Sequence, residues 1–194
     1  MDKEKILNEN ETLGIVAARA LIKLAGEDAA REGLARTPER FSKAYDHLFK
    51  GYREDLKSVV GQGIFRSESQ LPISVNNIDF YSLCEHHILP FWGRVDVVYI
   101  PDNKILGLSK IPRIVDVFAR RLQVQERLTK EIANGIQEVI NAKYVLVRIS
   151  SSHMCMKMRG VQKENSYAKT EYEIGLENIS ENLHSKCIKL IESD

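Results

Sequence analysis

The first fifty residues carry apolar side chains at the spacing of an α-helix. A first amphipathic helix is predicted to end near Gly26. A second is predicted to begin with Thr37 as its N-cap and Pro38 at its first helical position, and to end by Gly51. The apolar stripes of these helices are Leu13, Val16, Leu21 and Leu24 in the first and Phe41, Tyr45, Leu48 and Phe49 in the second.

From about Ile73 the apolar period changes to two, which is typical of β-strands. Between two groups of strands, apolar positions at helical spacing predict one helix that Ser109 caps and another that begins near Val124. A terminal helix is predicted to bury Cys187, because a free cysteine behaves as a small apolar side chain. The predicted strands are 73–75, 78–80, 94–100, 144–149 and 170–174.

The predicted strands flank the two helices in pairs. This order favours an α+β domain with an antiparallel sheet. We expect an N-terminal helical arm at residues 1–70 and a sheet-containing domain at residues 71–194.

Composition and charge exclude some classes of protein. Hydrophobic residues make up 43% of the 194 positions and charged residues 28%, which is ordinary for a globular protein. A formal net charge of +1 gives no reason to expect binding to nucleic acid or to a membrane. No apolar run approaches the roughly 20 residues of a membrane span, so a cytoplasmic location is expected. Three cysteines do not suggest a disulfide framework.

Two short segments concentrate residues that bind transition metals. Cys84 and His87 form a Cys-x-x-His pair directly after a predicted strand, and His153 and Cys155 follow another strand. Cys84, His87 and Cys155 would give zinc three protein ligands and leave a fourth position for water, which zinc activates near neutral pH. His86 and His153 would then lie beside the metal and shuttle protons.

Two other interpretations of these segments stay open. His86 or His153 could act as a fourth ligand and close a structural zinc site. A cysteine nucleophile with a histidine base would need no metal at all.

Several polar side chains near these segments suit a nucleotide. Ser109, Lys110 and Arg113 open a predicted helix, and the free N–H groups at a helix N-terminus attract anions. Arg159 lies just after the second ligand segment. The carboxylate of Glu126 could accept hydrogen bonds from a guanine edge, or simply complement the dipole of its own helix.

At these residues the chain resembles GTP cyclohydrolase I, the zinc enzyme of pterin and folate synthesis. The likeness covers about residues 37–163. It implies the tunnelling fold, which is an antiparallel sheet with two helices on one face, and a homodecamer whose active sites are shared between subunits. The matching strings are Ser-Leu-Cys-Glu-His-His-Ile-Leu-Pro-Phe at 82–91, Gly-Leu-Ser-Lys-Ile at 107–111, Phe-Ala-Arg-Arg-Leu-Gln-Val-Gln-Glu-Arg-Leu-Thr at 118–129 and Met-Arg-Gly-Val-Gln-Lys at 158–163.

The resemblance also implies a reaction and its residues. GTP and water would give 7,8-dihydroneopterin triphosphate and formate, in the first step of pterin and tetrahydrofolate synthesis. Zinc on Cys84, His87 and Cys155 would activate the water that attacks C8 of guanine, while His153 and His86 transfer protons. The residues implied in substrate binding are Glu126 and Gln125 at the guanine edge, Ser109 near the ribose, and Arg40, Lys110, Arg113 and Arg159 at the triphosphate.

The chain departs from the family pattern at residues 166–171. The family usually shows Ser-x-Thr-x-Thr-Ser here, whereas Ala168 lacks a threonine hydroxyl and Lys169 and Glu171 are unexpected. The change bears on local subunit packing and on the later rearrangement steps. It motivates one rival function, a paralogue that opens the purine ring without completing the pterin or that prefers another purine nucleotide. A rival of a different class is a non-catalytic assembly subunit stabilised by zinc, and the presence of both His86 and His153 speaks against it. A nitrile reductase of the same fold would not need this set of zinc ligands.

Overall fold

The computed structural model describes residues 3–192 of the chain, and the side chains of residues 11–192. The chain divides after Lys50 into two compact units. The division into a helical arm and a catalytic domain that the sequence suggests after residue 70 stays a prediction.

The first unit consists of the two predicted helices, α1 (Lys3–Leu24) and α2 (Thr37–Leu48). They pack closely where Gly14 faces Ser42, because a Cβ at Gly14 would overlap the Ser42 side chain. The Ser42 hydroxyl donates a hydrogen bond to the carbonyl oxygen of Glu11 at 3.0 Å. Phe41 and Tyr45 of α2 stack at 4.2 Å between ring centroids.

Two details of this unit differ from the sequence prediction. The predicted apolar stripe of α1 is exposed: Leu13, Val16, Leu21 and Leu24 are 51–84% exposed, whereas Ala18 and Ile22 are buried. Among the described residues of this unit, α2 is the one helix beside α1, and one partner covers one narrow face. The N-cap of α2 is Arg36, and Thr37 already lies inside the helix.

The second unit contains a five-stranded sheet with the strand order β5-β2-β3-β6-β7. Every neighbouring pair is antiparallel except β5 and β2, which run parallel. All five predicted strand segments are confirmed as parts of four strands of this sheet, since 73–75 and 78–80 both belong to β2, and β5 was not predicted. Its strands are β2 (Ile73–Cys84), β3 (Leu89–Ile100), β5 (Leu122–Gln123), β6 (Tyr144–His153) and β7 (Ala168–Ile174).

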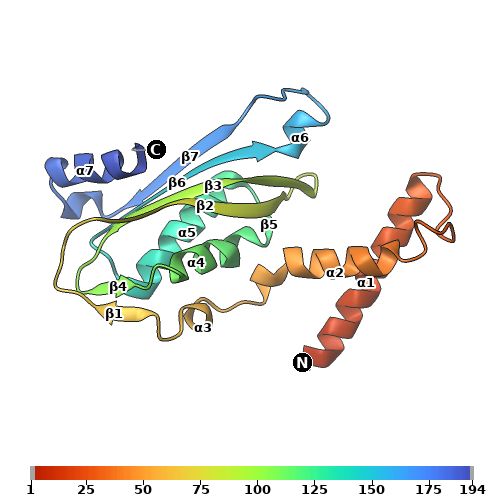
Figure 1. The fold of residues 1–194 in the computed structure, drawn as a ribbon, viewed down its shortest axis with the longest axis horizontal. Helices are drawn as coiled ribbons and strands as arrows, with labels where there is room; N and C mark the ends of the chain where they lie inside the picture. Colours follow the sequence, from red (N-terminus) through yellow and green to blue (C-terminus); the bar gives the residue numbers. More distant parts are fainter. Residues whose placement is uncertain (1–2, 193–194) are drawn as a thin grey trace. The chain divides into compact units, whose positions relative to one another are not determined.

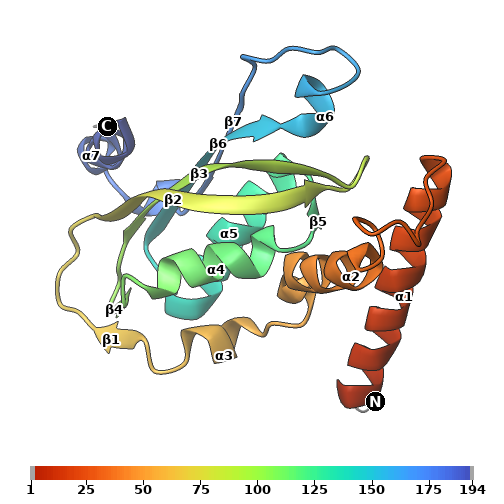
Figure 2. The same cartoon turned by 45° about the vertical axis from the view of Figure 1, so that its right-hand side comes forward.

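Helices cover both faces of the sheet in unequal measure. The helices α4 (Lys110–Ala119) and α5 (Gln125–Ile140) lie side by side on one face, and α7 (Glu181–Glu192) lies on the other (Figure 1, Figure 2). The main core forms between the sheet and the helices α4 and α5, because alternate residues of each strand point to that face. The expected α+β fold, with an antiparallel sheet and two helices on one face, is confirmed.

A smaller core forms on the face of the sheet that α7 covers, and it buries Cys187 of α7 completely, as the sequence predicts. Its partners come from the ends of β3 and β6, and Val98, Tyr144 and Leu146 are among them. The remaining short elements are α3 (Leu56–Val60), β1 (Ile64–Arg66) paired with β4 (Lys104–Leu106), α6 (Met154–Lys157), and the 3-10 turns η1 (Lys50–Tyr52) and η2 (Leu176–Asn178).

Strand register brings the two candidate ligand segments to the same end of the sheet. Cys84, the last residue of β2, is opposite Leu89 of β3, and Phe91 of β3 is opposite His153, the last residue of β6. A break in the register between Val75 and Ile78 lies far along β2 and leaves this end regular.

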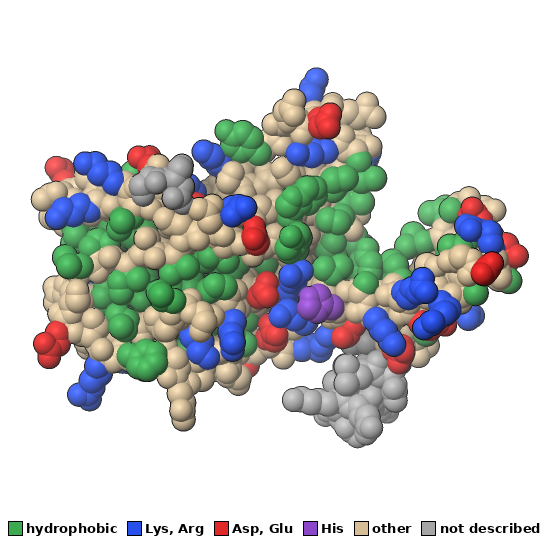
Figure 3. All heavy atoms as spheres, in the orientation of Figure 1, with side chains coloured by type: hydrophobic (Ala, Val, Ile, Leu, Met, Phe, Trp, Pro, Cys, Tyr) green, Lys and Arg blue, Asp and Glu red, His purple; other side chains and the backbone are tan. Residues whose placement is uncertain are grey.

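Among the described residues, no helix combines the length and the apolar character that a membrane span requires. On the face of residues 51–192 that Figure 3 shows, lysine and arginine side chains lie scattered among acidic ones, with hydrophobic side chains exposed between them. This mixture agrees with the small net charge of +1.

Candidate functional site

The first ligand segment is the turn that joins β2 to β3. Cys84 is buried at the end of β2, and its carbonyl oxygen accepts hydrogen bonds from the N–H of His87 at 3.2 Å and of Ile88 at 2.7 Å. Ile88 has a φ of 54°, a left-handed conformation that is costly for a β-branched residue. The turn therefore holds a strained backbone that presents the His87 side chain beside Cys84.

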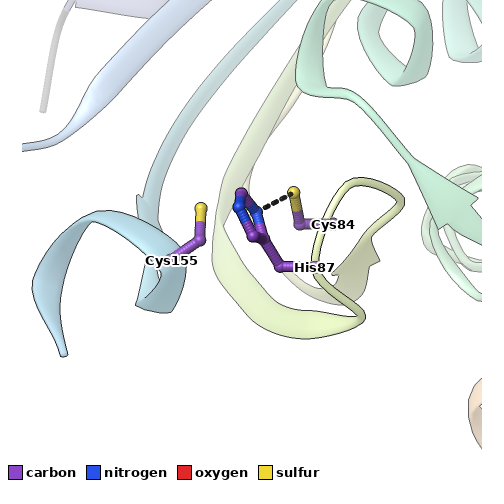
Figure 4. A group of neighbouring side chains, drawn as sticks. All are labelled: Cys84, His87 and Cys155. Atoms are coloured by element: carbon purple, nitrogen blue, oxygen red, sulfur yellow. Dashed lines mark hydrogen bonds between the residues drawn. The ribbon is translucent and has the colours of Figure 1, made fainter. Parts of the chain in front are cut away.

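The second ligand segment is the junction of β6 and α6. Cys155, in the single turn of α6, points toward Cys84 and His87 (Figure 4). One ligand atom of each of these three residues lies within 4.8 Å of the others. Two thiols and one imidazole form a donor set that suits a zinc ion. Of the side chains that the structure describes, neither His86 nor His153 belongs to this group.

The Cys155 thiol responds to its surroundings in this group. Burial raises the pKa of the Cys155 thiol, and the neighbouring Cys84 raises it further. The Nδ1 atom of His87 lies 3.8 Å from Cys84 Sγ, and Nη1 of Arg159 lies 3.1 Å from His87 Nε2. The sequence prediction that Arg159 lies near the ligands is thus supported in position.

His153 lies next to this group in a tightly defined position. Its ring stacks on Phe91 with centroids 4.5 Å apart and planes 5° apart. Its Nε2 atom lies 2.9 Å from Oε1 of Gln125 and 3.1 Å from the Ser151 hydroxyl. Burial lowers the pKa of His153, and the negative charge of Glu126 opposes that shift. An imidazole held in this way can exchange a proton with a ligand at the site.

An ion pair connects the ligand turn to α5. Arg127 binds the Glu85 carboxylate, which holds the pKa of Glu85 below its usual value. The same guanidinium donates to the carbonyl oxygen of Leu122 and to Oε1 of Gln123, both at 2.9 Å. The Glu85 N–H also donates to the Gln123 carbonyl oxygen at 3.0 Å. The turn is therefore fixed to β5 and α5 from outside the ligand group.

The predicted substrate residues fall into two groups. Gln125, Glu126 and Arg159 lie near His153 or His87, together with His86, whose Nδ1 is 3.9 Å from Cys84 Sγ. The cations of α4 occupy another region. Ser109, Lys110 and Arg113 lie at the N-terminal end of α4, and its C-terminal end leads to β5 beside Cys84.

The ten residues of α4 extend about 15 Å, so a single copy of the chain keeps these cations away from the ligand group. Lys110 instead donates from Nζ to the carbonyl oxygen of Val59 at 3.3 Å. Arg40 belongs to the first compact unit, and its role at the triphosphate stays a prediction.

Four polar residues of the site were missed by sequence reasoning: Ser151, Thr129, Thr170 and Arg127. Ser151 lies beyond the predicted strand 144–149, but this strand continues to His153 as β6, and there Ser151 precedes His153 by two positions and shares its face. Thr129 and Thr170 come from different elements, and only their packing brings them together.

Comparison with known proteins agrees with this geometry. A sequence model of the family described as GTP cyclohydrolase I matches residues 15–192. The chain is 51% identical over 173 residues to GTP cyclohydrolase 1 of Leptospira biflexa, covering 89% of this chain and 94% of that protein.

It is also 49% identical over 185 residues to GTP cyclohydrolase 1 of Chlorobaculum tepidum, covering 94% of this chain and 83% of that protein. Its identity to the protein of the same name from Campylobacter lari is 48% over 177 residues, covering 91% and 93%. The match spans both compact units and all three ligand side chains. The chain therefore belongs to the GTP cyclohydrolase I family.

Proposed function

We propose that this chain converts GTP and water to 7,8-dihydroneopterin triphosphate and formate, the first step of pterin and tetrahydrofolate synthesis. The observation that carries the proposal is the group of Cys84, His87 and Cys155 with His153 beside it. The family supports the choice of GTP, because relatives named GTP cyclohydrolase 1 match about nine-tenths of the chain. We expect the enzyme to work in the cytoplasm.

Zinc is the metal that we propose for the three ligands. When bound there, it supplies Lewis acidity for the hydrolysis of the guanine imidazole ring. His153 then holds or donates a proton at a ring nitrogen, and the exposed His86 exchanges protons with solvent beside it. Two thiols and one imidazole leave a coordination position for a reactant, which distinguishes this arrangement from a closed structural site.

The substrate contacts are proposed from chemistry and position. The exposed carboxylate of Glu126 near His153 suits the N1–H and amino group of guanine, which are both donors. Arg159 beside His87 offers a fork of N–H donors to phosphate.

We propose that Lys110 and Arg113 bind the triphosphate, which lies at the opposite end of GTP from the guanine ring. The expected homodecamer with active sites shared between subunits stays a prediction that rests on the family resemblance.

A turnover assay combined with metal analysis on the same preparation tests the proposal. Zinc-loaded protein incubated with GTP should release formate and give a fluorescent pterin after oxidation and dephosphorylation. Zinc-loaded protein that yields neither product would refute it. A product that retains the formyl carbon would instead favour the paralogue that stops after ring opening, for which the Ala168 segment is the motive.

Replacement of His153 separates catalysis from a structural zinc. We expect His153→Ala to keep one zinc per chain and to lose turnover, because His153 lies outside the ligand group. Loss of zinc from this variant would make His153 a fourth ligand and favour the assembly subunit.

A further inference from the structure

The side-chain amide of Gln125 has only one orientation that its surroundings accept. Gln125 is 3% exposed at the first turn of α5. Its Nε2 lies 3.2 Å from the carbonyl oxygens of Ile149 and Ala168, and 3.1 Å from the Thr170 hydroxyl. A carbonyl oxygen can only accept, so the NH₂ group must face these two carbonyls. The amide oxygen Oε1 is thereby turned toward His153.

The proton on His153 follows from that orientation. Oε1 of Gln125 lies 2.6 Å from the Ser151 hydroxyl and 2.9 Å from Nε2 of His153. An amide oxygen can only accept, so Nε2 must be the atom that carries a proton. Ser151 gives its single proton to Oε1, and its oxygen, 3.1 Å from Nε2, is free to accept from the same N–H.

Two threonines extend this hydrogen-bond network to β7, and the donor and acceptor of each bond can again be assigned. The Thr129 hydroxyl donates to the carbonyl oxygen of Gln125 at 2.7 Å. The Thr170 hydroxyl, 2.6 Å from Thr129, must therefore donate to it, which leaves the Thr170 oxygen to accept from Gln125. Every donor in this buried network thus has an acceptor, and a network satisfied in this way is rigid.

We propose that Gln125 is a positioning residue that holds His153 as the Nε2–H tautomer, so that Nδ1 is the ring nitrogen that serves the substrate. In the described part of the chain, the hydrogen bonds of the His153 ring all involve Nε2. Stacking on Phe91 sets the plane of the ring, and Gln125 sets its rotation and tautomer. The inference rests on the proposed function and gives Gln125 a role other than a direct contact with guanine.

The departure from the family pattern at residues 166–171 leaves this network complete. Ala168 takes part through its backbone carbonyl, which any residue supplies. Thr170 contributes the one side chain of β7 that the network uses. Lys169 and Glu171 alternate with these residues along the strand and point to the opposite face of the sheet.

The tautomer of His153 can be determined by NMR, without measuring enzymatic turnover. The measurement is magic-angle-spinning ¹⁵N NMR of zinc-loaded protein labelled at its histidines. The sample is kept at about pH 8.5, where a histidine with the ordinary pKa of about 6.5 is neutral. The His153 signals are assigned by their absence in His153→Asn. We expect a protonated Nε2 and an unprotonated Nδ1. The opposite tautomer, or an equal mixture of the two, would overturn the proposal.

Kinetics separate positioning from substrate binding. Gln125→Leu should lower kcat about 10- to 100-fold, less than the roughly 100- to 10,000-fold contribution of a proton-transfer group itself, and change KM less than about twofold. Gln125→Glu keeps an oxygen for Nε2–H but loses the NH₂ donor to the carbonyl oxygens of Ile149 and Ala168, so it should recover only a small part of the lost kcat. A KM that rises as much as kcat falls, or an unchanged kcat in Gln125→Leu, would overturn the proposal.

Two controls complete the experiment. Lys169→Ala changes the opposite face of the same strand and should keep wild-type kcat. Zinc content is measured for each variant, so that loss of metal is not mistaken for loss of positioning. If the wild-type protein does not turn over GTP, the proposed function fails, whereas the NMR result still decides the tautomer. If Gln125→Leu does not fold, the NMR measurement on the wild type decides alone.

Discussion

At the scale of single residues, the metal ligands depend on side chains that do not bind the metal. Arg127 is the clearest case, because its guanidinium joins Glu85 of the ligand turn to Leu122 and Gln123. Residues that orient metal ligands in this way commonly change metal affinity when they are replaced. The strained Ile88 next to His87 adds to the need for such support.

We predict that Arg127→Met weakens zinc binding about 10- to 100-fold, because the ligand turn loses its connection to α5. Competition with a chromophoric chelator measures the affinity. Arg148→Met is a matched control, because Arg148 forms an ion pair with Glu171 elsewhere in the same sheet. Equal affinities for Arg127→Met and the wild type would show that the turn holds its shape unaided.

At the scale of elements, the site depends on the close pairing of β3 with β6. Gly93 of β3 allows this approach, because a Cβ there would overlap the carbonyl oxygen of Ser150 and lie 2.6 Å from the Cα of Ser151. Both obstacles are backbone atoms, which cannot rotate away. The same two strands carry Phe91 and His153, so their spacing bears directly on the site.

We predict that Gly93→Ala lowers the free energy of unfolding by about 1–3 kcal/mol, the usual cost of overpacking. It should also weaken zinc retention, because β6 leads into Cys155. Urea unfolding measures the first effect. Gly107→Ala is the control: its Cβ would meet Phe65 at 3.5 Å, an ordinary contact, and stability should stay within about 0.5 kcal/mol. Similar losses for both variants would contradict the steric argument.

At the scale of the whole molecule, α7 closes the second face of the sheet around a buried thiol. Burial, and then the charge of Glu173, raise the pKa of Cys187 from 9.0 to about 11. Burial also raises the pKa of Tyr144, whose hydroxyl donates to Glu173 at 2.8 Å. These groups stay protonated in the folded state at a pH where the unfolded chain loses their protons.

The free energy of unfolding should therefore fall as the pH rises from about 9 to about 11, because the unfolded state binds fewer protons there. The share of Cys187 is about 2–3 kcal/mol, since one pKa unit corresponds to about 1.4 kcal/mol. Urea midpoints across this range should fall less steeply for Cys187→Ala than for the wild type. Leu183→Ala, which truncates the same helix without removing a titrating group, should keep the wild-type slope. Equal slopes for all three proteins would contradict the assignment to Cys187.

Metal removal should also lower the stability of the folded protein. Cys84 and Cys155 lie on segments distant in sequence, so an ion between them stabilises the folded state over the unfolded chain. A strong chelator should lower the Tm of the zinc-loaded wild type and have little effect on Cys155→Ser, which lacks one ligand. A chelator shift as large in Cys155→Ser as in the wild type would place the metal elsewhere.

Local patterns were enough to predict most elements of this fold. The period of apolar residues located the long helices and all five predicted strand segments of the main sheet, because that period reports which face of an element is buried. The short elements β1, β4 and β5, of two or three residues each, were not predicted, because so short a segment shows no period of apolar residues. The exposed stripe of α1 could not be foreseen, because a pattern does not reveal what covers it.

The sequence by itself determined the chemistry available at the site, because Cys84, His87, His153 and Cys155 follow recognisable strand signals at a spacing that suits a metal. Only the tertiary structure decided how these residues meet. The register of β2, β3 and β6 brings two distant segments to one end of the sheet. The hydrogen bonds that orient His153 join α5, β6 and β7. Such contacts depend on long-range packing, which leaves no local pattern along the chain.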